Sequence, residues 1–318
     1  MFDVPRKPYL LAVFRLPYLR QMKTRLLLSL LTATGWLLTP NTGRAQSPGR
    51  ITILVDAFGP SPGLQQDWGF AALIEYQGKR ILFDTGNNSE TFAANAQALG
   101  VDLTRLDAVV ISHRHGDHTD GLRHLLGVNP RVKIYAPRDE YFGGPTPAGF
   151  FRRPEPALPA RMRYFNGQVP AQVPHGSPWR AANLTLVDSA AAVLPGFRVV
   201  RNLAPAGQPF DETPELSLAI ETPRGQVLVV GCSHPGIERI LASVSARQRP
   251  VQLLVGGLHL VQTPPAELER LAGALREQWG VVNVAPGHCT GEAAFAVLQR
   301  RFAAQYRYAG VETTLAFP

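Results

Sequence analysis

The spacing of apolar and polar positions predicts a body of short strands and longer helices from residue 51 onward. Runs rich in β-branched and aromatic residues predict strands, whereas helically spaced runs that end near glycine predict helices. Strands are expected at 51–55, 70–76, 80–83, 108–111, 132–136, 184–187, 197–200, 216–221, 226–230, 251–255 and 281–284. Helices are expected at 90–99, 123–126, 237–246, 265–279 and 292–302, before a tail at 311–317.

The order of these elements predicts an α/β (α+β) fold. Strands lead early in each half and strand–helix alternation closes the second half, which favours two packed sheets with helices outside. No boundary signal divides residues 46–318, so we expect one domain.

Residues 143–180, approximately, form a proline- and glycine-rich insertion that excludes continuous helix or central strand. Two interpretations are open: a functional loop near the mouth of a site, or a solvated decoration. The aromatic set of Tyr141–Phe151 and Trp179 could wall a pocket for an apolar substrate, or pack against itself.

The first 45 residues have the composition of an export signal. Lys23 and Arg25 precede an apolar run at 26–38, and Gly43-Arg44-Ala45 offers small residues for cleavage. The run is too short for a comfortable membrane span, and an uncleaved N-terminal anchor is the alternative. We therefore expect an exported protein, periplasmic or extracellular, without membrane contact beyond the leader.

The charge distribution argues against a nucleic-acid partner. The net charge is +8, but residues 1–45 hold seven of the 32 basic residues and one of the 24 acidic ones. The rest carries 25 basic and 23 acidic residues, a net of +2. A body so close to neutrality lacks the electrostatic footprint of a polyanion-binding protein. A small-molecule substrate is expected, and the oligomeric state stays open.

Six of the eight histidines follow predicted strands, where loops from one face of a sheet converge. These are His113, His115, His118, His234, His259 and His288. The spacing of His113 and His115 allows both rings to bind one cation. The side chains of the adjacent Asp117 and His118 can point toward a second cation beside it. Nitrogen and carboxylate donors suit zinc, manganese or iron. Two such ions about 3.5 to 4 Å apart can share a water and lower its pKa toward about 7.

The chain resembles the metallo-β-lactamase superfamily, whose signature is HxHxDH after a strand. It is most similar to the branch of dihydropteroate synthase-like and 7,8-dihydropterin-6-methyl-4-(β-D-ribofuranosyl)aminobenzene-5′-phosphate synthase-related proteins. The resemblance rests on residues 68–70, 81–86, 95–103, 109–121, 231–237, 256–260 and 286–291. It implies a four-layer αββα sandwich with two metals at one edge between the sheets. Asp84 matches a strand-end aspartate that supports the ligand loop from behind.

The resemblance also implies roles for the histidine cluster. His113 and His115 match ligands of a first metal, and Asp117 and His118 match ligands of a second. Asp117 is also a candidate general base. His288 matches the last ligand of the second metal. Two divalent ions, zinc foremost with iron or manganese as alternatives, are the expected cofactors.

The chain departs from the family pattern at two ligands. The stretch 199–205 lacks the third first-metal histidine, and Cys232 stands where a bridging aspartate is usual. His234 is the natural substitute for the missing imidazole, and His259 is another nearby donor or substrate contact. A carboxylate from the adjoining loop is a weaker alternative, from Asp211, Glu212 or Glu215.

The two cysteines allow different interpretations. Cys232 and Cys289 could form the single disulfide of an exported protein. Each, however, lies beside a histidine at the end of an apolar run, which favours a thiolate ligand at Cys232. A buried inert thiol is the third possibility for either residue.

The predicted function is that of an exported, dinuclear metal-dependent hydrolase. A metal-bound hydroxide would attack an ester-, lactone- or phosphoester-like substrate, with Asp117 handling the proton. The alternative is a metal-binding redox or sensor protein that uses a cysteine-containing iron or zinc site without hydrolysis.

Overall fold

The computed structural model describes residues 48–59, 63–139, 181–206, 213–246 and 248–318, together with 142, 146–147, 156, 168, 172–173 and 179. The predicted leader and most of the predicted insertion lie outside these residues. None of the described helices is long and apolar enough to cross a membrane.

Thirteen of the strands form two sheets. The seven-stranded sheet has the order β15 (Thr314–Phe317), β1 (Gly49–Val55), β2 (Ala71–Tyr76), β3 (Lys79–Phe83), β4 (Ala108–Val110), β5 (Lys133–Pro137) and β8 (Asn183–Val187). The six-stranded sheet has the order β14 (Val284–Gly287), β13 (Val251–Gly257), β12 (Gly225–Val230), β11 (Pro214–Thr222), β10 (Phe197–Leu203) and β9 (Ala190–Leu194). A separate short pair joins β6 (Thr146–Pro147) and β7 (Gln172–Val173).

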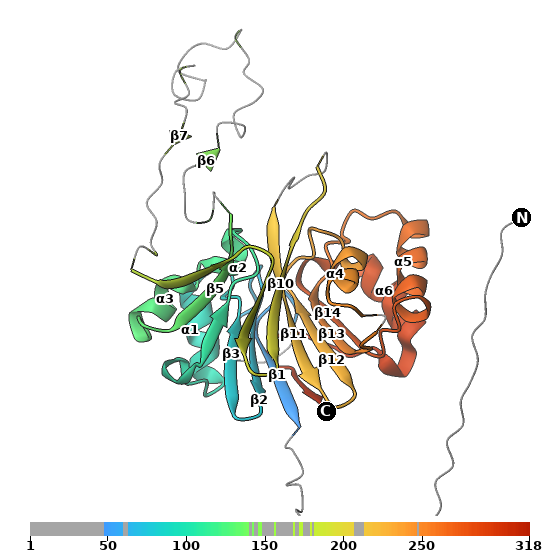
Figure 1. Ribbon diagram of the computed structural model, residues 1–318, viewed down its shortest axis with the longest axis horizontal. Helices are drawn as coiled ribbons and strands as arrows, with labels where there is room; N and C mark the ends of the chain where they lie inside the picture. The colour runs from blue at the N-terminus through green and yellow to red at the C-terminus, as the bar shows by residue number, and fades with distance from the viewer. Residues whose placement is uncertain are drawn as a thin grey trace, which may run out of the picture. The chain divides into compact units, whose positions relative to one another are not determined.

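Helices cover the outer face of each sheet, as Figure 1 shows. The seven-stranded sheet is covered by α1 (Ser89–Ala98) and α3 (Leu122–Val128), and the six-stranded sheet by α4 (Ile237–Ser243), α5 (Pro265–Glu277) and α6 (Glu292–Phe302). The one-turn helix α2 (Gly116–Thr119) follows β4 and carries Asp117 and His118. Short 3₁₀ turns lie at Leu103–Arg105, His288–Thr290 and Ala303–Gln305.

Three apolar layers hold this arrangement together. The central layer lies between the sheets and includes Phe83 of β3 and Val229 of β12, both fully buried. A second layer joins the six-stranded sheet to α4, α5 and α6, and a third joins the seven-stranded sheet to α1 and α3. The predicted αββα sandwich is therefore confirmed.

Local sequence explains several element boundaries. Gln77 and Gly78 adopt φ values of 51° and 73°, the left-handed conformation that a two-residue hairpin turn needs. Asn88 caps α1 by accepting a hydrogen bond from the Thr91 N–H at 2.9 Å. Pro265 opens α5, at a position where a missing N–H costs nothing.

Two expectations about elements were wrong in detail, and one strand of the six-stranded sheet was not predicted. The strand expected at 281–284 begins only at Val284 and runs through Pro286, which is tolerated because β14 is an edge strand. The helix expected at 237–246 ends at Ser243, before Ser245 takes a positive φ. The alanine-rich strand β9 was not predicted, because alanine has low strand propensity and β9 depends on pairing with β10.

Candidate metal centre

The predicted metal ligands lie together at one edge of the sandwich. Asp84 follows β3, the His113–His118 cluster follows β4, and Cys232, His259 and His288 follow β12, β13 and β14. Within each sheet these strands run parallel to one another, so their carboxyl ends meet at one edge. A backbone hydrogen bond of 2.7 Å from Leu216 of β11 to the Ser112 carbonyl joins the two sheets there.

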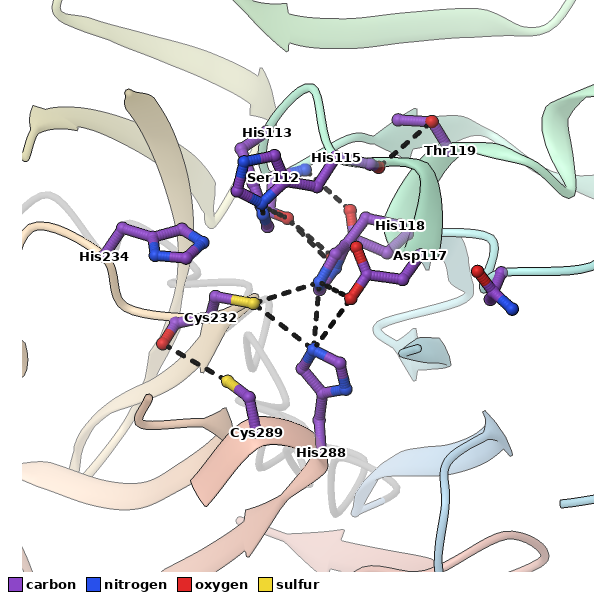
Figure 2. Close-up of polar contacts among 12 residues, drawn as sticks. Ser112, His113, His115, Asp117, His118, Thr119, Cys232, His234, His288 and Cys289 are labelled. Carbon is purple, nitrogen blue, oxygen red and sulfur yellow. Dashed lines mark hydrogen bonds and ion pairs between the residues drawn. The ribbon is translucent and has the colours of Figure 1, made fainter. Parts of the chain in front are cut away.

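Four side chains converge on one point, which we call the second donor set: Asp117, His118, Cys232 and His288. Figure 2 shows their donor atoms pointing toward one another. His118 Nε2 lies 3.2 Å from both Cys232 Sγ and His288 Nε2, and Cys232 Sγ lies 3.3 Å from His288 Nε2. Asp117 Oδ2 lies 3.4 Å from His288 Nε2 and 3.7 Å from His118 Nε2.

These separations fit a metal ion. Zinc with nitrogen, oxygen and sulfur ligands in a tetrahedron places neighbouring donor atoms about 3.3 to 3.7 Å apart. His118 donates its Nδ1–H to Asp84 Oδ2 at 2.7 Å, so its Nε2 faces the cluster as a lone pair. A converging set of lone pairs in a buried site is the arrangement that a cation stabilises.

Three imidazoles form a neighbouring group, which we call the first donor set: His113, His115 and His234. His113 Nε2 lies 3.0 Å from His115 Nδ1, and the ring of His234 lies 4.9 Å from each of the other two rings. The structure thus places His234, the residue expected to replace the imidazole that the stretch 199–205 lacks, beside His113 and His115. Cys232 Sγ belongs to the second donor set and not to the first, so the grouping gives no support to a bridging thiolate.

Burial keeps the first donor set neutral. It lowers the pKa of His115 to about 4 and lowers the pKa of His113 well below its ordinary value. Neutral imidazole is the form that binds metal. For Asp117, burial alone would raise the pKa, but the hydrogen bond with His288 and the nearby imidazoles outweigh it and lower the pKa. Asp117 is therefore an ionised acceptor.

Asp84 supports both donor sets through a buried relay. Its carboxylate accepts from the Ser112 N–H at 2.6 Å and from the Ser112 hydroxyl at 2.7 Å. The same hydroxyl lies 2.9 Å from His113 Nδ1. Because the hydroxyl proton is directed at Asp84, the oxygen accepts from His113 Nδ1, which leaves His113 Nε2 facing the site. The predicted supporting role of Asp84 has a geometric basis.

Glu215 holds the loop after β12. Its buried carboxylate accepts from the backbone N–H groups of Cys232, Ser233 and His234 at 3.0, 2.8 and 2.8 Å. Burial raises its pKa to about 7, although these donors favour the ionised form. Sequence reasoning included Glu215 only as a weak ligand alternative, but its carboxylate orients two donors from behind. Asp211 and Glu212 lie outside the described residues.

Two residues near His288 were missed by the sequence analysis. Buried Asp56 follows β1 and accepts from the His288 N–H at 2.9 Å. The half-exposed Trp68 ring lies 5.0 Å from the His288 ring and forms a wall beside the second donor set. The signal for Asp56 was present, because it is another aspartate directly after an apolar strand.

His259, the two cysteines and part of the aromatic set are the remaining residues that the sequence singled out. His259 lies beside the first donor set, with its ring 4.5 Å from that of His234. Cys232 and Cys289 are free thiols, and the Cys289 thiol lies 3.7 Å from the Cys232 carbonyl oxygen. Of the aromatic set at 141–151 and 179, Phe142 and Trp179 pack together on the helix-covered side of the seven-stranded sheet. The others lie outside the described residues.

Comparison with known proteins fits this geometry. A family model for the metallo-β-lactamase superfamily matches residues 69–207, which include Asp84 and the His113–His118 cluster. Residues 69–207 of this chain therefore match the metallo-β-lactamase superfamily. Proteins of the superfamily generally bind metal ions, and each of the two donor sets is a cluster that could hold one.

Solved metallo-β-lactamase structures share the fold. A metal-dependent hydrolase of the β-lactamase superfamily is 24% identical, with a TM-score of 0.65, over 84% of this chain and 98% of the solved chain. The metallo-β-lactamase fold protein YhfI from Bacillus subtilis is 14% identical, with a TM-score of 0.54, over 85% and 99%. Identities this low indicate common architecture and do not transfer an activity.

A curated relative also spans most of the chain. The 7,8-dihydropterin-6-methyl-4-(β-D-ribofuranosyl)-aminobenzene-5′-phosphate synthase of Methanocaldococcus jannaschii is 26% identical over 281 residues, or 79% of this chain and 90% of the relative. The name of this relative describes that protein, and an identity of 26% does not transfer its reaction to this chain.

Proposed function

We propose that this protein is a hydrolase that uses two divalent metal ions, one in each donor set, on a small ester-, lactone- or phosphoester-like substrate. The observation that carries the proposal is the pair of adjacent donor sets at one sheet edge, one with three imidazoles and one with four mixed donors. Metals bound there would supply Lewis acidity and lower the pKa of a coordinated water toward about 7.

The chain's own residues support hydrolysis at this edge. Asp117 keeps an ionised carboxylate and retains 18% side-chain exposure, so it can accept a proton from a reacting water. The Asp84 and Ser112 relay fixes which ring nitrogens of His113 and His118 face the site. Glu215 and Asp56 hold the backbone beneath Cys232 and His288. The donors are therefore oriented before any substrate arrives.

The donor chemistry favours zinc, with iron or manganese as alternatives. A thiolate among imidazoles suits zinc or iron, whereas calcium and magnesium prefer shells made only of oxygen. The composition of residues 1–45 supports export to the periplasm or beyond. The near-neutral body supports a small-molecule substrate and gives no reason to invoke nucleic acid.

The direct test combines metal analysis with turnover. Purified full-length protein is expected to carry two zinc-like equivalents and to hydrolyse at least one of a panel of nitrophenyl esters, lactones and phosphodiesters. His115→Ala should reduce hydrolysis to background. The matched variant His124→Ala removes a histidine that lies against Phe92, outside both donor sets, and should keep activity. Metal-loaded protein inactive on the whole panel would contradict the proposal.

A redox or sensor function is the second candidate, favoured by the thiol of Cys232 in the second donor set and the thiol of Cys289 beside it. An iron–thiolate absorption band in the purified protein, without hydrolysis of any substrate tested, would favour this candidate. A colourless zinc protein with turnover would exclude it.

A further inference from the structure

A cavity of about 890 Å³ opens beside the first donor set. Its inner wall includes Ser233, His234 and His259. Because His234 is also a member of the first donor set, the cavity and the metal centre share a side chain. A substrate held at the metals can therefore extend into this space without crossing another layer of the protein.

The body of the cavity is apolar. Ile237 at the start of α4, Leu258 after β13 and Leu271 of α5 line it and are each less than 7% exposed. Leu260 is partly buried in the same lining, and Val261 is 58% exposed there. Apolar side chains that line a concavity of this size are typical of sites for small organic groups.

The charged residues of the described lining cancel one another. They are Glu238, Arg239, Glu267 and Arg270, two acids and two bases. Arg270 already pairs with Glu238 at 2.6 Å and with Glu267 at 2.7 Å. A phosphate-binding pocket needs an excess of positive charge or clustered donors, and this lining offers no such excess. The cavity suits an uncharged group.

The inner wall is fixed before ligand binding. Ser233 and His259 both hold positive φ, 65° and 51°, and the Ser233 hydroxyl donates to the Gly257 carbonyl at 2.8 Å. That bond links the loop after β12 to the end of β13, and Glu215 anchors the former loop through three backbone N–H groups. Strained backbone held by several contacts is typical of binding sites.

We propose that the substrate is a carboxylic ester or lactone whose uncharged, apolar acyl group occupies this cavity, with the ester carbonyl at the metal centre. The assignment rests on the proposed hydrolase function and narrows its substrate class. It differs from the phosphate-containing compound in the name of the curated relative. His234 and His259 stand where the reacting carbonyl meets the acyl group, so both contribute to its positioning.

The test is a chain-length series on metal-loaded full-length protein. Nitrophenyl esters of acetic, butyric, hexanoic and octanoic acid are compared with bis(nitrophenyl) phosphate. The kcat/KM of the esters should rise roughly fourfold per added methylene until the cavity is filled, because each methylene leaves water. Leu260→Trp fills the cavity and should reduce hexanoate turnover more than acetate turnover. Leu186→Trp, on strand β8 and outside the cavity lining, should leave the whole series unchanged.

Binding without turnover gives a second readout. Calorimetric titration of metal-free protein with octanamide, a neutral amide, should show tighter binding to the parent protein than to Leu260→Trp. Equal kcat/KM for all four esters, faster turnover of the phosphodiester, or equal octanamide binding to both proteins would overturn the cavity assignment while leaving hydrolysis intact. Inactivity on every ester, on the phosphodiester and on the lactones of the wider panel would instead overturn the proposed function.

Discussion

The two donor sets lie side by side but differ in composition and support. The second set has four donors of three chemical kinds, with His118, Cys232 and His288 fully or almost fully buried. Three carboxylates, of Asp84, Glu215 and Asp56, accept hydrogen bonds from the His118 ring or from the backbone of Cys232 and His288. The first set has three imidazoles, of which His115 and His234 are only partly buried, and it adjoins the cavity through His234.

We infer from this difference that the two sets have different roles. Four protein donors complete a tetrahedron and close a metal site, whereas three imidazoles leave a position for water or substrate. We therefore expect the second set to bind its metal more tightly and the first set to present the reacting centre to the cavity. Substitutions that affect one set alone would show that the sets are independent, and substitutions that affect both would show that they act as one.

Loss of a donor gives the largest effect. Cys232→Ala should remove one metal equivalent, abolish the thiolate–cobalt absorption band of cobalt-loaded protein and reduce hydrolysis to background. Cys289→Ala is the matched control, because Cys289 lies next to His288 but outside both donor sets. Metal analysis and cobalt spectra measure the outcome. Full retention of both equivalents by Cys232→Ala would contradict the grouping of donors.

Loss of the supporting relay gives the next effect. Asp84→Asn should weaken metal binding by roughly 10 to 100-fold, because a neutral amide with one acceptor oxygen replaces the carboxylate that accepts from His118 Nδ1–H and Ser112. Ser112→Ala removes the contact to His113 and should mainly weaken the first set. Competition with a chromophoric chelator measures each affinity. If Ser112→Ala lowered the metal affinity of the second set alone, the proposed hydrogen-bond chain from Asp84 through Ser112 to His113 would be contradicted.

Glu215→Gln tests the element that both sets share. The carboxylate holds the backbone of Cys232 and of His234, so its loss should weaken both sets together. Unfolding stability should fall by about 1–3 kcal/mol, because buried N–H groups lose an acceptor. Denaturant unfolding of metal-free protein and a chelator titration give the two readouts. An effect on one set alone would show that the loop does not couple them.

The smallest effect concerns the pH dependence of the metal-free protein. Burial lowers the pKa of His115 to about 4, from an ordinary value near 6.5. Between those values the unfolded chain binds more protons than the folded one, so stability falls as pH falls from about 6.5 to 4. His115→Gln should flatten this slope, whereas His124→Gln should not. Urea unfolding at stepped pH values measures it.

Most of the fold and the approximate place of the site could be predicted from the sequence, because the residues with metal-binding side chains directly follow the apolar runs that form strands. Asp84, the histidine cluster and Cys232 each follow an apolar strand, and the strands end at one edge. Local patterns could not reveal which donors share one point, because this depends on how two sheets pack. The same limit explains why the role of Glu215 was not predicted. Glu215 is the second residue of β11, and its carboxylate contacts the loop that follows the neighbouring strand β12.

The supporting carboxylates and the cavity depend on contacts between distant segments. Asp56 meets the His288 backbone across 232 positions of sequence, and no local period reports such a contact. The cavity arises from the loops before α4 and α5, each of which is an ordinary helix entry by itself. The sequence left open whether the aromatic set of Tyr141–Phe151 and Trp179 walls a pocket or packs against itself. Its two described members, Phe142 and Trp179, pack against each other.

The most direct test is a zinc titration of metal-free protein against a chromophoric chelator, with ester hydrolysis followed in parallel. We expect two binding steps of different affinity, with the tighter step lost in Cys232→Ala and the weaker step lost in His234→Ala. Hydrolysis should appear as the weaker step fills. A single binding step, or full hydrolysis with only the tighter equivalent bound, would contradict the division of the centre into a closed and an open site.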